Sequence, residues 1–233
     1  MNRLSNIREP QRLTMTWQPP EAGPHARTRR VVAEVLRCEH GYVFRYLPNS
    51  EDYIAAIKCG FQGYPAFRLS TELHDQGVVE AFSRRLPPRK REDFGEFLEK
   101  HSLPQPFPLS DFALIGYTGA SLPSDGFSFV PDFGDNPLPF EYVTELAGVR
   151  HVRGNDISDV SVGDQVTFAP DTENSVDRDA VYAVQGGLPL GYVNRVLRKQ
   201  VAIWLASDRL SARVERCGRI QNRPFVYVRL EYR

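Results

Sequence analysis

The chain has 233 residues, of which 41% are hydrophobic, and its mean hydropathy is −0.40. These values are typical of a folded protein and suffice for one large domain or two small ones. Because 29 basic residues balance 29 acidic ones, the composition excludes a global field that would draw the protein to a polyanion, so any nucleic-acid contact must be local.

The cysteine content favours a reducing, cytoplasmic setting. The chain has three cysteines without a C-x-x-C pair or an even number that would indicate a disulfide framework: Cys38, Cys59 and Cys217. No apolar run follows the charged N-terminus, and no stretch reaches the roughly 18 apolar residues of a membrane helix. The sequence therefore predicts neither a signal peptide nor a membrane span.

The first part of the chain is predicted to be a small α+β domain after an N-terminal arm. Residues 1–29 combine prolines and scattered charge, which is typical of a loosely ordered arm, although a strand could form around Leu13 to Trp17. From Arg30 onward, β-like runs at 31–37 and 42–46 flank a turn-prone Glu-His-Gly segment and predict a hairpin.

Helical spacing follows this hairpin. Apolar residues recur on one side of 78–86 and of 90–101, and Pro87 and Pro88 separate these two predicted helices. Further apolar segments lie at 111–117 and 126–130, the second alternating as a strand. We therefore expect the first domain to span 30–132.

Residues 131–139 contain three prolines and little to bury, which indicates a domain boundary. Beyond it, short apolar runs alternate with turns over 137–233, and this spacing favours a small barrel or curled sheet. One helix is expected at 193–205, with an apolar core stripe and a solvent-facing cluster of Arg195, Arg198 and Lys199. The predicted fold class is α+β.

The balanced charge hides an asymmetry within this second domain. Residues 141–190 hold three arginines against nine acidic residues, whereas residues 191–233 hold ten basic residues against three acidic ones. The C-terminal segment is therefore a candidate basic surface.

Two segments of the second domain resemble the HIRAN family over about 95 residues. Pro170-Asp-Thr-Glu-Asn-Ser-Val-Asp-Arg-Asp-Ala-Val181 precedes Gly186-Gly-Leu-Pro-Leu-Gly-Tyr-Val193, and Gly148 to Gly154 is similar to that family's first strand and loop. The resemblance implies an OB-like β-barrel with one or two helices. HIRAN modules occur with helicases and nucleases or alone in bacteria, and the best understood kind captures the 3′ end of single-stranded DNA.

The resemblance also implies roles for individual residues. Asp177 would accept a hydrogen bond from a free 3′-hydroxyl and would repel a 3′-phosphate. Arg150 and Arg195 would bind backbone phosphates. The remaining residues would offer hydrogen bonds or stack on bases; they are His151, Asn174, Tyr192 and Phe225.

A departure from the family pattern and a structural alternative accompany this assignment. His151-Val152 stands where the family has an aromatic pair, which removes stacking surface. Asn174 and Asp177 would also suit an ordinary turn, where such side chains bond to their own backbone. Tyr192 and Phe225 would also suit positions at least half inside the core.

The first domain resembles, over about 100 residues, the N-terminal subdomain of HipA-type kinase toxins. The resemblance lies in Tyr42 to Leu47, Phe82 to Pro88, Arg91 and Ser110 to Gly119. In split versions of these toxins, this region can be a separate protein that restrains the kinase. The resemblance therefore implies a HipA-like kinase as partner and a toxin–antitoxin setting.

Catalytic patterns are not found in the sequence. Phosphoryl transfer needs metal-binding carboxylates, a base and a phosphate-gripping lysine or loop, but neither H-x-D-x-x-x-x-N nor G-x-x-x-x-G-K-[ST] occurs. The five histidines lack zinc-ligand spacing, and no G-x-S-x-G elbow occurs. We therefore expect no enzyme activity, cofactor or metal.

The sequence leaves three hypotheses. The first is a non-enzymatic accessory protein with two domains, whose HIRAN-like module binds DNA, including single-stranded 3′ ends, while the other module contacts a protein. The alternative is a protein-interaction or antitoxin-like factor without nucleic-acid binding. A third is an enzyme, such as a nuclease, whose site has no recognisable pattern.

Overall fold

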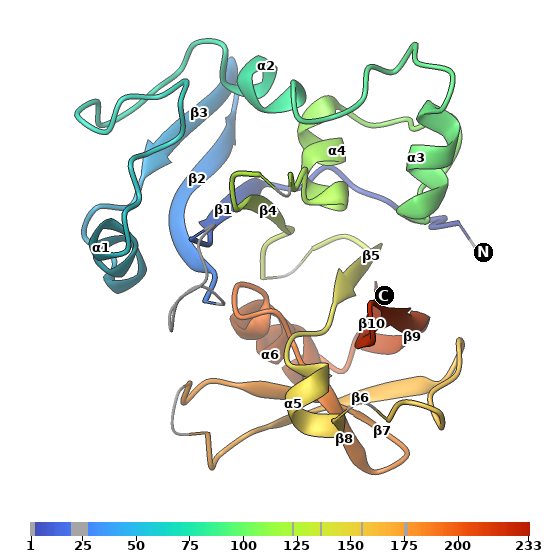
Figure 1. Cartoon of the computed structure of the whole chain (residues 1–233). Helices are drawn as coiled ribbons and strands as arrows, with labels where there is room; N and C mark the ends of the chain where they lie inside the picture. The colour runs from blue at the N-terminus through green and yellow to red at the C-terminus, as the bar shows by residue number, and fades with distance from the viewer. Residues whose placement is uncertain (1–2, 20–27, 123, 136, 155, 175–176) are drawn as a thin grey trace. The chain divides into compact units, whose positions relative to one another are not determined.

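The computed structural model describes residues 3–19, 28–122, 124–135, 137–154, 156–174 and 177–233 (Figure 1). They divide into two units, one formed by Arg8–Phe133 and one by Gly134–Arg233 together with residues 3–7. Each unit combines an antiparallel sheet with helices, which confirms the predicted α+β class. The domain ranges 30–132 and 137–233 stay predictions, and residues 20–27 of the predicted arm lie outside the described residues.

The first unit is built on a four-stranded antiparallel sheet with the order β3-β2-β1-β4. Its strands are β1 (Arg12–Trp17), β2 (Arg30–Cys38), β3 (Gly41–Tyr46) and β4 (Phe127–Asp132). The predicted hairpin is confirmed as β2 and β3. The strand that the sequence allowed within the N-terminal arm is present as β1, and it lies inside the sheet between β2 and β4.

Four helical segments accompany this sheet: α1 (Glu51–Lys58), α2 (Val78–Ser83), α3 (Phe94–Lys100) and α4 (Asp111–Thr118). The two predicted helices are present in shortened form as α2 and α3, whereas α1 was not predicted. The side chains of Ser50 and Ser110 cap α1 and α4 by accepting backbone N–H bonds from Tyr53 and Ala113, each at 3.1 Å.

Aromatic rings fill the core between this sheet and its helices. Phe44 is fully buried, and its ring centroid lies 4.5 Å from Phe67 and 5.6 Å from Phe82. Phe82 in turn lies 4.8 Å from Phe129 on β4. Such rings each contribute roughly 1.5–3 kcal/mol by burial, so they account for much of this unit's stability.

The predicted linker at 131–139 is partly wrong. Pro131 and Asp132 complete the buried strand β4, and Phe133 is only 4% exposed. The Asp132 carboxylate also bonds the guanidinium of Arg12 on β1. The proline content was misleading because Pro131 follows four strand residues and lies on an edge strand, where a missing N–H donor is tolerated.

The second unit is a curled six-stranded antiparallel sheet with the order β5-β10-β9-β6-β7-β8. Its strands are β5 (Phe140–Glu145), β6 (Gln165–Pro170), β7 (Val181–Gln185), β8 (Leu188–Tyr192), β9 (Leu210–Ile220) and β10 (Arg223–Tyr232). Strand β6 pairs first with β9 through Gln165 and Val166 and then with β7, which turns the sheet back on itself.

Of the small barrel or curled sheet that the sequence favoured, the described strands form the curled sheet and not a closed OB-like barrel. The two edges of the curled sheet meet at one isolated bridge between Ala147 and Tyr192, with backbone hydrogen bonds of 2.8 and 2.7 Å, and not along a ladder of paired strands. Strand β5 ends at Glu145, so a strand that would close the ring is too short to pair with β8.

Two helices accompany the curled sheet. The segment expected as a first strand and loop forms the short helix α5 (Val149–Arg153), because the preceding strand β5 already ends before it. The stripe expected around 193–205 is confirmed: α6 (Arg198–Ala206) and its preceding turn place Leu197, Val201 and Trp204 in the core with no exposed surface.

Residues 3–7 attach to the outer side of this sheet. The Glu141 carboxylate on β5 accepts backbone N–H bonds from Ser5 at 2.5 Å and Asn6 at 2.9 Å, and Leu4 is 2% exposed. Glu141 also lies 3.5 Å from the buried guanidinium of Arg229, which binds Glu215 through two bonds of 2.8 Å. Residues 3–7 are therefore part of the second unit.

Candidate nucleic-acid interface

A turn between β6 and β7 forms one side of the candidate interface. The backbone N–H of Asp171 donates to Ala180 at 2.9 Å, and the N–H of Ala180 donates to Asp177 at 3.0 Å. Asn174 accepts the Asp177 N–H at 2.8 Å, the local bond expected of an asparagine in a turn. Residues 175 and 176 of this segment lie outside the described residues.

Two tyrosines from neighbouring strands lie beside this turn. Tyr182 on β7 and Tyr192 on β8 are directly opposite each other, with ring centroids 4.5 Å apart and nearly parallel planes. Both rings are half-buried. Their neighbours Ala183 and Val193 are buried in the core, so strand alternation puts both rings on the outer side of the sheet.

Asp171 fixes the orientation of this tyrosine pair. The Tyr192 hydroxyl donates to the Asp171 carboxylate at 2.9 Å and lies 3.0 Å from the Tyr182 hydroxyl. Burial by itself would raise the pKa of Asp171, but hydrogen bonds from Tyr192, Asn174 and Tyr182 together lower it. Burial, followed by the bonds to Tyr182 and Asp171, raises the pKa of Tyr192. At neutral pH, the ionised Asp171 carboxylate therefore accepts a hydrogen bond from the neutral Tyr192 hydroxyl.

Asp177 has a different environment from the free acceptor that the sequence suggested. Its carboxylate forms an ion pair with Arg198 on α6 and lies 4.0 Å from the Arg195 guanidinium. Arg198 also bonds Asp179 at 3.2 Å, and its side chain is only 13% exposed. The expectation that Arg198 faces solvent is therefore wrong, because it pairs with the turn, whereas Arg195 and Lys199 are exposed.

Helix α5 borders the tyrosine pair on another side. Gly148, which precedes α5, has a φ of +67°, and a Cβ at this position would lie 3.1 Å from the Tyr192 ring. The close approach of backbone and ring therefore requires glycine here. Arg150 and His151 follow on α5 and are exposed.

Phe225 lies farther along the sheet than the other predicted residues. It is half-buried on β10, where its ring covers Gly218 of β9. The next residue, Val226, accepts a hydrogen bond from Leu146 at 2.9 Å, and Ala147 pairs with Tyr192. Phe225 and Tyr192 are thus linked through the backbone of residues 146–147.

The structure therefore places the predicted residues in three groups. Asn174, Asp177, Tyr192 and Arg195 are joined by direct contacts. Arg150 and His151 extend from the neighbouring helix, and Phe225 lies on β10. Sequence reasoning missed the role of Asp171, Tyr182 and Arg198.

The comparisons with known proteins found similarity to solved structures only. No family model and no curated protein matches the sequence. The chain is similar to the crystal structure of the HIRAN domain of human HLTF, with 16% identity over 40% of this chain and 74% of that chain and a TM-score of 0.32. It is also similar to a protein from Lactobacillus plantarum, with 16% identity over 41% of this chain and 98% of that chain and a TM-score of 0.33. Similarity at this level does not assign the chain to a family.

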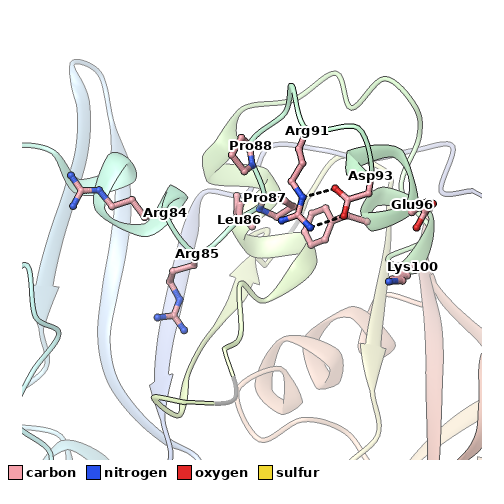
Figure 2. A pocket seen from close by; sticks show the side chains of 10 residues that line it. Arg84, Arg85, Leu86, Pro87, Pro88, Arg91, Asp93, Glu96 and Lys100 are labelled. Carbon is pink, nitrogen blue, oxygen red and sulfur yellow. Dashed lines mark hydrogen bonds and ion pairs between the residues drawn. The ribbon is translucent and has the colours of Figure 1, made fainter.

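A separate cavity of about 520 Å³ lies in the first unit, between residues 84–88 and helix α3 (Figure 2). Its charged lining residues are Arg84, Arg85, Arg91 and Lys100 together with Asp93 and Glu96. Arg91 bonds both carboxylate oxygens of Asp93, whereas the side chains of Arg84 and Arg85 point away from that pair. Arg85 instead bonds Asp125.

The described ranges contain neither a membrane-spanning helix nor a metal-binding cluster. No helix there is long and apolar enough to cross a membrane. Likewise, the described residues contain no group of three or more histidine, cysteine, aspartate or glutamate side chains placed to hold a metal ion.

Proposed function

We propose that the second unit is a HIRAN-like module that binds nucleic acid at the tyrosine pair. The observation that carries this proposal is a stacked, half-exposed pair of rings held by Asp171, with the exposed guanidinium of Arg195 nearby and that of Arg150 on the adjoining helix. An aromatic platform of this kind contributes roughly 1–3 kcal/mol per stacked base, and arginines beside it bind phosphates. Because the net charge of the chain is zero, nucleic acid would have to be bound by such a local cluster and not by an overall positive field.

Asp177 adds a preference for the 3′ end of a nucleic-acid strand. The Asp177 carboxylate, which pairs with Arg198, can accept a hydrogen bond from a 3′-hydroxyl, whereas a 3′-phosphate would offer it no such donor. Single-stranded 3′ ends are therefore the proposed ligand. Comparing oligonucleotides that end in a 3′-hydroxyl, a 3′-phosphate or a blunt duplex tests this preference, and equal affinity for all three would refute it.

Tyr192 offers a matched test of the platform. Tyr192→Ala removes a stacking ring and should weaken single-strand affinity by about 5- to 150-fold, measured by fluorescence anisotropy at about 50 mM salt. Tyr192→Phe keeps the ring and loses the hydroxyl, so most of the affinity should remain. If both variants bind as the unchanged protein does, the platform proposal is wrong.

We propose that the protein acts without catalysis. A nuclease is the enzyme class closest to this ligand, and incubation of labelled DNA with magnesium or manganese measures cleavage directly. Intact DNA after incubation supports the proposal, and metal-dependent cleavage that survives repurification overturns it.

We also propose that the first unit contacts a protein, with a HipA-like kinase as the expected partner. Support comes from the resemblance around residues 82–91 and from the cavity at the same place. Co-elution with a purified HipA-type kinase should be lost with Phe97→Ala, which opens the cavity wall, and kept with Ile57→Ala elsewhere in the unit. A failure of the unchanged protein to co-elute would refute this partner.

The alternative is a protein-interaction or antitoxin-like factor whose second unit binds no nucleic acid. The absence of single-strand binding by the unchanged protein at about 50 mM salt would favour it, since phosphate contacts are strongest at low salt.

A further inference from the structure

The β9–β10 hairpin extends beyond its neighbouring strands as a two-stranded ribbon. We define this ribbon as residues 216–220 of β9 and 223–227 of β10, joined by a turn at Gln221 and Asn222. Strand β6 pairs with β9 only at Ala212 and Arg213, and β5 pairs with β10 only from Tyr227 onward. Most of the ribbon thus has no strand alongside it in the described sheet.

The ribbon combines positive charge with aromatic rings. Residues 216–223 contain three arginines and no acidic residue, and Arg219 and Arg223 are exposed. The Arg216 guanidinium lies 4.4 Å from the centre of the Tyr227 ring, and the half-buried Phe225 ring lies over Gly218. Interleaved arginines and rings are typical of surfaces that follow a nucleic-acid backbone.

Acidic residues near the ribbon are already engaged. Hydrogen bonds from Ser158 lower the pKa of Asp156, with smaller contributions from the charges of Arg153 and Arg219. Glu145 accepts a hydrogen bond from the Tyr227 hydroxyl at 3.3 Å. Asp164, whose charge acts on Cys217 of the ribbon, accepts hydrogen bonds from the Ser161 N–H at 2.8 Å and from the Gln185 side chain at 3.0 Å. The ribbon residues themselves, 216–220 and 223–227, contain three arginines and no acidic residue.

The ribbon and the tyrosine pair lie on the same outer side of the curled sheet. Val226 and Val228 have no exposed surface, so strand alternation directs Phe225 outward, as it does Tyr192. Val226 and Tyr192 hydrogen-bond to the neighbouring residues Leu146 and Ala147, respectively. Their backbones are therefore about two strand spacings apart, roughly 10 Å.

Helix α5 connects the two sites. It contacts both β8 and β10, and it presents Arg150 and His151 to solvent. Cationic and aromatic groups thus continue from Arg195 and Tyr192, along α5, to the ribbon. Phosphates of one strand in a B-form duplex are roughly 3.4 Å apart along the axis, and they lie farther apart in an extended single strand. A single strand that leaves the tyrosine pair would therefore reach the ribbon within a few nucleotides.

We infer that the ribbon is a second contact for the same nucleic-acid strand, in which Arg219 and Arg223 bind the phosphates that follow the nucleotides at the tyrosine pair. This inference rests on the proposed function and adds a length requirement to it. The tyrosine pair alone holds the terminal nucleotides, whereas the ribbon holds only strands that are long enough to cross α5.

The test compares two double variants that remove the same charge. Arg219→Gln with Arg223→Gln changes the ribbon, and Arg37→Gln with Lys58→Gln changes exposed positions of the first unit. Affinity for a labelled oligothymidylate of about 12 nucleotides is measured over a salt series. The ribbon variant should bind about 5- to 20-fold more weakly at about 50 mM salt and lose about 1.4 from the slope of log affinity against log salt, or 0.7 per phosphate. The control variant should match the unchanged protein.

A short probe separates the ribbon from the tyrosine pair. For a thymidine dinucleotide, whose single phosphate cannot follow the strand from the tyrosine pair across α5, the ribbon variant should bind as the unchanged protein does, whereas Tyr192→Ala should bind more weakly. Equal binding of the long probe by the ribbon variant and the unchanged protein would overturn the ribbon contact and leave the proposed function standing. The ribbon contact would also be overturned if the control variant lost as much affinity for the long probe as the ribbon variant does. Polyglutamate that competes with the protein's binding as well as the oligothymidylate does would overturn it too, because the contact would then not be specific to nucleic acid. No binding of either probe by the unchanged protein would overturn both proposals.

Discussion

Two sets of aromatic rings, one from each unit, lie in contrasting surroundings. In the first unit, Phe44, Phe67 and Phe82 contact one another and are almost completely buried. In the second, Tyr182, Tyr192 and Phe225 are half-buried on the outer side of a sheet, in a region that also carries the exposed Arg195, Arg150, Arg219 and Arg223. Ring content alone therefore does not indicate a binding surface. The combination of partial exposure, a fixed orientation and nearby cations does.

The largest expected effect tests the structural side of this contrast. Phe44→Ala removes a ring with no exposed surface from a dense aromatic cluster, so the free energy of unfolding should fall by about 3–5 kcal/mol. Urea unfolding measures the loss. Ile57→Ala, at a position 43% exposed on α1, is the control and should change the free energy by less than about 0.5 kcal/mol. A loss below about 1 kcal/mol for Phe44→Ala would contradict the proposed role of this cluster.

The next effect separates two arginines that the sequence placed in one cluster. Arg198→Gln breaks the pairs with Asp177 and Asp179 and should destabilise the protein by about 1.5–3 kcal/mol in thermal or urea unfolding. Arg195→Gln changes an exposed side chain and should alter stability by less than about 0.5 kcal/mol while weakening single-strand affinity several-fold. Equal stability of the two variants would show that burial does not distinguish these arginines.

Local patterns in the sequence predicted elements but not the contacts between them. The hairpin of β2 and β3 and the apolar stripe of α6 follow from alternation and helical spacing, which are properties of neighbouring residues. In a regular hairpin around the Gly186-Gly187 turn, Gly191 would lie opposite Tyr182. A β-bulge between Ala183 and Val184 shifts the register by one residue and brings Tyr192 opposite Tyr182 instead, which is why the sequence did not predict this pair. Likewise, the pairing of Arg198 with Asp177 depends on how α6 lies against the turn, which spacing does not encode.

A smaller effect concerns Phe225, where packing and stacking are separable. Phe225→Leu keeps an apolar side chain over Gly218 but removes the aromatic face, so stability should change by less than about 1.5 kcal/mol. Affinity for a long single strand should fall by about fivefold or more, near the lower end of base–aromatic stacking. Anisotropy and urea unfolding measure the two quantities on the same preparation. A loss of stability with unchanged affinity would place this ring with the structural rings of the first unit.

The smallest effect is a pH dependence that arises from Asp171. Its pKa is lowered in the folded protein because the hydrogen bonds from Tyr192, Asn174 and Tyr182 outweigh the opposing effect of burial. A lowered pKa contributes stability that is fully present above the unfolded value of about 3.9 and is lost as pH falls through the folded value. The stability difference between the unchanged protein and Asp171→Asn should therefore be constant from about pH 5 to 8 and shrink below about pH 4. Urea unfolding over this range measures it. A difference that stays constant down to about pH 2 would mean that the Asp171 charge does not hold the tyrosine pair, and that the orientation of the two rings comes from packing alone.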